Sequence, residues 1–128
     1  MKHLTEEQLH LCQQYLNTVF GIEEGFEYVK ASFTDFSKTE GDLVLSDIIQ
    51  SFFSIAQTNI LLERLFIDDK KIQQAIKQFK EVTEAAFMLE GHFDHYDTRV
   101  KVVNDNLYPT FFAWSESIQV ALSRNVTQ

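Results

Sequence analysis

VTEAAFMLEGHFDHYDTRVKVVNDNL, residues 82–107, has the most regular apolar spacing in the chain. Its apolar residues follow one another at steps of 4, 3, 4, 3, 4, 3 and 4, which is the spacing of a helix that packs along a bundle seam. We therefore expect one long helix that begins after Asp68 and bends near Gly91, because glycine weakens a helix interior. The residues of this stripe are Val82, Ala86, Leu89, Phe93, Tyr96, Val100, Val103 and Leu107.

A first helix is predicted upstream, over about residues 6–37. Thr5 and Gln8 form a capping-box pattern in front of an apolar stripe with steps of three and four. Gly21 and Gly25 lie four residues apart and therefore on one side of this helix. We favour a local bend, or glycines that the helix simply tolerates, over the alternative, a close approach of another helix.

A second helix is predicted over about residues 43–67, with Asp42 or Ser46 as its cap. Its apolar face is unusually wide, which predicts the most buried helix of the set. Asn59 falls on the apolar side. It is either a buried polar residue that sets the register of packing or a residue at the wet edge of the seam.

The last helix is predicted over about residues 110–124. Asn104-Asp105-Asn106 predicts a break before it, and Pro109 suits an early helical position. Four glycines and one proline are too few turn residues for a sheet protein, and short connections place successive helices antiparallel. We expect an all-α, up-down antiparallel four-helix bundle with unequal helix lengths, forming one domain over 1–128.

Charge and composition exclude several classes of protein. The net charge is −8, of which −7 falls on residues 1–68, and nucleic-acid binding requires clustered Lys and Arg instead. The apolar run 43–67 contains Asp47, Glu63 and Arg64, so it does not predict a membrane span. The N-terminal residues lack the apolar run of a signal peptide. We expect a soluble, cytoplasmic protein that binds neither nucleic acid nor membrane.

The segment EGHFDHYD, residues 90–97, resembles a metal or acid–base site in composition. Within the predicted long helix, however, His92 and His95 lie off the seam on the solvated flank, three residues apart. A metal needs three or four converging ligands, so a third would have to come from another helix, such as Glu63 or His10. The favoured interpretation is a solvated flank without metal or cofactor, and a weaker alternative is a metal site at these histidines.

The aromatic content is heavy for this length, with twelve Phe, four Tyr and one Trp. Aromatic residues beyond what one bundle can bury predict a partner groove or a dimer contact. The candidate contact residues are Phe20, Phe87, Phe112 and Trp114. Cys12 lies on an apolar stripe, and we interpret it as a small buried hydrophobic residue rather than a catalytic thiol.

These features favour a non-enzymatic interaction protein, such as an adaptor, an export chaperone or a regulator, that acts through an apolar, aromatic-rich surface. It would bind an amphipathic segment of a protein partner or pair with itself. The chain shows no phosphate loop, nucleophile elbow or dinucleotide fingerprint. In size and expected fold alone it is similar to small bacterial helical chaperones that hold flagellar or secreted subunits. The alternatives are a metal-binding bundle protein and a structural dimerisation module.

Overall fold

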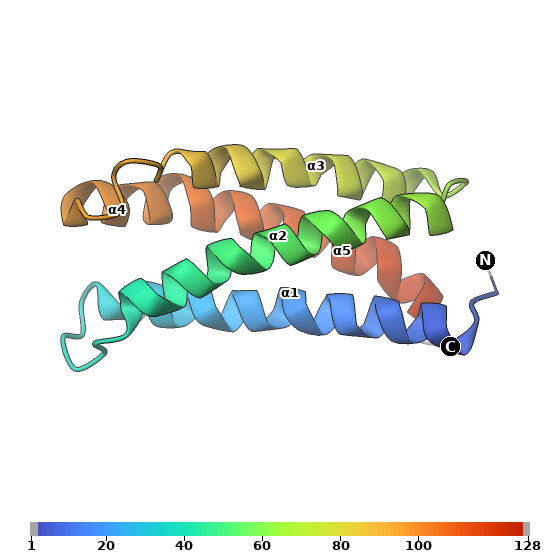
Figure 1. The fold of residues 1–128 in the computed structure, drawn as a ribbon, viewed down its shortest axis with the longest axis horizontal. Coiled ribbons are helices and arrows are strands. Elements are labelled where there is room, and N and C mark those ends of the chain that lie inside the picture. Colours follow the sequence, from blue (N-terminus) through green and yellow to red (C-terminus); the bar gives the residue numbers. More distant parts are fainter. Residues whose placement is uncertain (1–2, 127–128) are drawn as a thin grey trace.

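The structure, a computed structural model, describes residues 3–126. In these residues four helical rods pack against one another, and successive rods run antiparallel, so that both chain ends lie at the same end of the bundle (Figure 1). The expected all-α four-helix bundle is therefore confirmed. The elements are α1 (Glu6–Ser32), α2 (Gly41–Leu65), α3 (Lys70–Phe87), α4 (Tyr96–Val102), η1 (Val103–Leu107) and α5 (Tyr108–Val126), the last three forming one continuous rod.

Local capping explains where two of the helices begin. The Thr5 hydroxyl accepts the backbone N–H of Gln8, whose side chain accepts the N–H of Thr5, so the predicted capping box is confirmed. The Asp69 carboxylate accepts the N–H of Ile72 at the start of α3. The predicted cap of α2 is wrong, because that helix already begins at Gly41 after an N-cap residue with no side-chain hydrogen bond.

The stretch 82–107 does not form one helix, which corrects the main sequence prediction. α3 ends at Phe87, and the chain reverses through a series of turns over 88–95 before α4 begins. Gly91 has a φ of 76°, a left-handed conformation that other residues adopt at a cost and that a right-handed helix cannot contain. At Gly91 the rod is thus interrupted by a chain reversal, where we expected a bend within a continuous helix.

The break predicted at Asn104-Asp105-Asn106 is also wrong, because these residues lie inside the continuous rod. They form part of η1, a π-helical turn in which the N–H of Tyr108 donates to the carbonyl of Val103, five residues earlier. A proline removes one helical donor and crowds the carbonyl four residues before it. The wider turn of η1 ends two residues before Pro109, and the helix continues through the proline as α5.

The core consists of aromatic and aliphatic side chains from all four rods. Its centre is Trp114, which is 0% exposed and lies with its ring centroid 4.7 Å from that of Phe79 and 5.6 Å from that of Phe111. Where α1 and α2 cross, a Cβ placed on Gly25 would lie 3.1 Å from Cδ1 of Ile48. The structure thus supports close helix packing at Gly25. A Cβ on Gly21 would meet nothing within 4 Å, so the helix simply tolerates that glycine, and α1 continues unbroken through both.

Two polar groups are buried between α1 and α2. The Tyr15 hydroxyl donates to Oδ1 of Asn59 at 2.6 Å, and both residues are buried. Asn59 is therefore the buried polar residue of the two alternatives, and its hydrogen bond holds the two helices in one register. Cys12 is fully buried with a free thiol, as predicted. Burial raises the pKa of Cys12 to about 11 and also raises the pKa of Tyr15.

Because of these buried groups, we expect the free energy of unfolding to fall as the pH rises above about 9. Cys12 and Tyr15 keep their protons in the folded chain at a pH where the unfolded chain has lost them. The unfolded state then binds fewer protons, and stability decreases with pH. Urea unfolding at pH 7, 9, 10 and 11 measures this fall, and Tyr15→Phe should make it shallower. An equal slope in Tyr15→Phe would contradict the assignment to Tyr15.

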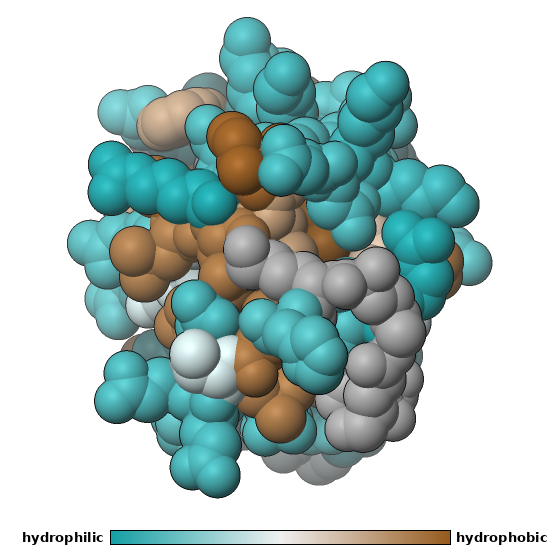
Figure 2. Space-filling model, turned by 90° about the vertical axis from the view of Figure 1, so that its right-hand side faces the viewer, coloured by the Kyte–Doolittle hydropathy of each residue, from teal (hydrophilic) through white to brown (hydrophobic). Residues whose placement is uncertain are grey.

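Figure 2 shows the end of the bundle that carries both chain ends, where hydrophilic side chains surround a few hydrophobic ones. A hollow of about 510 Å³ lies at the turn between α2 and α3, near the end of α5. Two aspartates, two lysines and Arg124 contribute to its lining. This mixture of charges selects no class of ligand. Among the described residues, no helix has the length and apolar character needed to span a membrane.

Candidate functional site

An apolar groove of about 570 Å³ lies between α2 and α3. The two helices are joined by a short turn at 66–69, and in Figure 1 they move apart with distance from it. This divergence leaves facing side chains uncovered along about two turns of α2. The groove is lined by Ile49, Phe52, Phe53 and Ala56 of α2, by Thr83, Ala86 and Phe87 of α3, and by Leu89, Glu90, Gly91 and Phe93 of the following turns.

Two phenylalanines make this groove unusual for a surface. Phe53 on α2 and Phe87 at the end of α3 are 69% and 68% exposed, and both line the groove. Phe52 and Leu89 line the same groove and are buried. A contiguous apolar surface of this kind typically marks a binding site for a protein or another apolar ligand.

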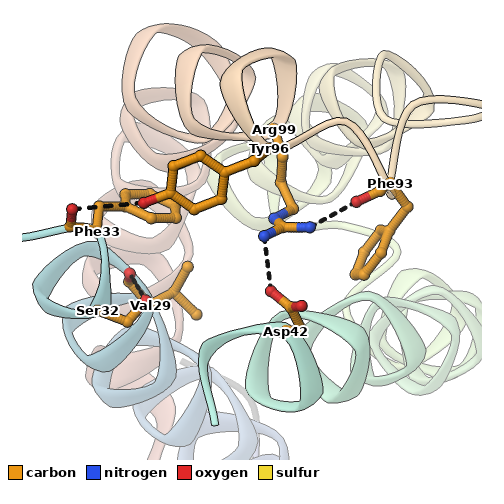
Figure 3. A network of polar contacts seen from close by, with 7 residues as sticks. All are labelled: Val29, Ser32, Phe33, Asp42, Phe93, Tyr96 and Arg99. Atoms are coloured by element: carbon orange, nitrogen blue, oxygen red, sulfur yellow. Dashed lines mark hydrogen bonds and ion pairs between the residues drawn. The ribbon is translucent and has the colours of Figure 1, made fainter. Parts of the chain in front are cut away.

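The turns over 88–95 form one wall of the groove, and Arg99 holds them in place (Figure 3). Its guanidinium donates to the carbonyl of Phe93 at 2.6 Å and pairs with the Asp42 carboxylate at 2.8 Å. It also lies over the rings of Phe93 and Tyr96. The Tyr96 hydroxyl in turn donates to the carbonyl of Phe33 at 3.4 Å. These contacts connect the groove wall to the adjoining ends of α1 and α2.

The histidines His92 and His95 lie in these turns and not on the flank of a helix, which corrects the predicted position. Both are exposed, and their Nδ1 atoms are 3.4 Å apart. Among the described residues, no group of three or more His, Cys, Asp or Glu side chains is arranged to hold a metal ion. The structure thus brings the two histidines together without assembling the third ligand that the metal alternative requires.

The four predicted contact residues do not converge on one surface. Phe87 lines the groove, whereas Phe20 lies exposed on α1, outside the groove lining. Phe112 is half-buried and packs against Tyr108, with ring centroids 4.5 Å apart. Trp114 is buried at the centre of the core, which corrects its assignment to a contact surface.

Sequence reasoning missed Phe53 as a candidate contact residue. The wide apolar face of α2 predicted a deeply buried helix, but the divergence from α3 leaves Ile49 and Phe53 at the edge of the groove. The width of this apolar face was the sequence signal that could have indicated an exposed edge, because packing against a single bundle seam requires only a narrower apolar stripe.

A second polar cluster lies between α1 and α5 and joins these two helices. The Glu23 carboxylate accepts hydrogen bonds from the Ser115 hydroxyl and, at 2.7 Å, from the Gln119 amide. The Tyr108 hydroxyl donates to Glu27 at 2.6 Å, which raises the pKa of Tyr108 to about 12. These side chains bond to one another across the helix pair, so they hold the rods together.

Comparison with known proteins gives a family and one partial relative. The sequence profile of a family described as a domain of unknown function (DUF8042) matches residues 10–117. The chain is also similar to the uncharacterized protein YvzG of Bacillus subtilis (strain 168), with 36% identity over 77 residues. That alignment covers 59% of this chain and 60% of the relative's length. No solved structure matches the chain.

Proposed function

The chain belongs to the DUF8042 family, and we propose that it is a non-enzymatic binding protein that holds an amphipathic helix of another protein in the groove between α2 and α3. The observation that carries the proposal is the pair Phe53 and Phe87, both about two thirds exposed and both lining one groove. Large aromatic side chains that water surrounds in the free protein are the usual anchors of a protein interface.

The shape of the groove favours a helix as the occupant. Its α2 wall is formed by Ile49, Phe53 and Ala56, which are spaced by four and three residues and so lie along one ridge. Eight residues of helix span roughly 12 Å, or about two turns. A helix laid between two diverging helices packs its side chains against the ridges of both, and an apolar helix face in such a groove is a recurrent mode of recognition.

The proposal includes a cytoplasmic location, which the single cysteine supports. Cys12 is a free thiol, buried in the core. A single cysteine cannot form a disulfide within the chain, so folding does not require an oxidising compartment. A second copy of this chain is the competing occupant of the groove, and the crosslinking experiment distinguishes it from a helix of another protein.

The groove is tested by photo-crosslinking in cells that produce the protein. A photoreactive phenylalanine analogue replaces Phe53 or Phe87 and, as the control, Val120, which is 62% exposed on α5 outside the groove lining. We expect both groove positions to crosslink to the same segment of another protein, and the control position not to. The segment is identified by mass spectrometry and prepared as a synthetic peptide.

Binding of that peptide is then measured with Phe53→Ser, Phe87→Ser and Val120→Ser. Removing an interface anchor typically costs at least about 2 kcal/mol, roughly a thirtyfold loss of affinity. We expect that loss for the two groove variants and none for Val120→Ser, with melting temperatures close to that of the unmodified chain. Crosslinks to a second copy alone, or an unchanged affinity in both groove variants, would overturn the proposal.

A further inference from the structure

The groove has an acidic end, and we infer that the helix it takes is cationic, with a Lys or Arg over Glu90. This inference rests on the proposed function and specifies the chemistry of the partner. Glu90 is exposed and supplies the one charged side chain among the described residues that line the groove. An acidic occupant or a carboxylate-bearing lipid would place like charges together at this end.

The surroundings of Glu90 reinforce its negative charge. The residue lies three positions after the end of α3, and its backbone N–H donates to the carbonyl of Phe87. Carbonyls at a helix end carry a partial negative charge, and the described residues of α3 include no Lys or Arg in the last turn. Residues 88–97 contain Glu90, Asp94 and Asp97 but no Lys or Arg. The nearest cation in sequence, Arg99, is already bonded to Asp42 and to the Phe93 carbonyl.

The opposite wall of the groove is uncharged. The sequence of α2 from Ile48 to Leu62 contains no Asp, Glu, Lys or Arg. The charge in the groove is therefore concentrated at the end of α3, whereas apolar contacts run along its length. This uneven distribution of charge fixes the direction in which the bound helix lies. Its cationic turn lies over the turns 88–95, and its apolar face lies against Phe53 and Phe87.

Two synthetic amphipathic helices test the inference. They share one leucine- and phenylalanine-bearing face and a glutamine polar face, and they differ only at two polar positions of one terminal turn, which are both Lys or both Glu. Dissociation constants are measured by fluorescence anisotropy at low and moderate salt. An exposed charge pair contributes about 0.2–1 kcal/mol, and the two peptides exchange attraction for repulsion at two positions. We therefore expect the Lys peptide to bind about tenfold more tightly at low salt, a difference of about 1.4 kcal/mol, with a smaller ratio at higher salt.

Two variants locate the origin of that preference. Glu90→Gln removes the acidic end of the groove, and we expect it to reduce the preference for the Lys peptide to about threefold or less. Glu116→Gln on α5 changes the net charge equally, at an exposed residue outside the groove lining, and should keep the full preference. Equal loss in both variants would assign the attraction to the overall charge and overturn the inference.

The remaining outcomes separate this inference from the proposed function. Equal binding of the two peptides, abolished by Phe53→Ser, would overturn the cationic preference and leave the docking role intact. Binding of neither peptide, or binding that Phe53→Ser and Phe87→Ser do not weaken, would contradict the docking role itself. Phe→Ser changes no charge, so loss of binding in those variants reports the apolar contact alone.

Discussion

Replacing Trp114 with alanine is expected to lower the free energy of unfolding by about 3–5 kcal/mol, the largest effect of any substitution considered for this chain. The side chain is 0% exposed, and its rings lie against Phe79, Phe111 and Tyr15. Its indole N–H also donates to the carbonyl of Ala75 at 3.0 Å. Alanine would remove these contacts and leave a cavity where three of the four rods meet.

Urea unfolding followed by circular dichroism measures this loss. Domains of this size have a total stability of about 5–15 kcal/mol, so the variant should unfold at a much lower urea concentration or fail to fold. Val120→Ala, at an exposed position on the same helix, should change stability by less than about 0.5 kcal/mol. A cost below about 1 kcal/mol for Trp114→Ala would contradict the central position of this residue in the core.

The second large effect is expected for Arg99→Ala, at about 2–3 kcal/mol. The charged hydrogen bond from its buried guanidinium to the Phe93 carbonyl is part-buried, and bonds to charged groups contribute about 1.5–3 kcal/mol. The ion pair with Asp42 adds little, because the Asp42 side chain is 65% exposed and its charge is solvated when the partner is removed. Asp42→Asn should accordingly cost less than about 1 kcal/mol.

Arg99→Ala should also loosen one wall of the groove. Without the guanidinium, the turns 88–95 lose their connection to α2, and their backbone amides should exchange with solvent faster. Hydrogen–deuterium exchange with mass spectrometry measures this, and Lys101→Ala, an exposed neighbour on α4, is the control. Unchanged exchange in 88–95 would show that the turns hold their conformation without Arg99.

Much of the helical architecture could be predicted because its causes are local. The capping box at Thr5 and the burial of Cys12 follow from residue type and spacing over a few positions. The helix over 82–107 was mispredicted for a specific reason. Steps of four and three continue across Gly91, since Leu89 and Phe93 pack against the core from turns instead of from a helix.

The candidate site was less predictable than the fold. Trp114 was a predicted contact residue and Phe53 was not, but the structure buries Trp114 and exposes Phe53. The difference arises because α5 lies against its neighbours along the core, whereas α2 diverges from α3. No local pattern marks Arg99 as a structural residue, because its ion pair with Asp42 joins segments that are far apart in sequence.

The sequence by itself determined that this chain is helical, which residues favour burial, and where a capping box begins the first helix, because these properties depend on neighbours along the chain. Tertiary structure alone decided that the chain reverses at 88–95 and that a groove remains open beside Phe53 and Phe87. Periodicity reports which side chains favour an apolar environment. Whether another helix covers them depends on how the rods cross, and that is set by packing between residues distant in the sequence.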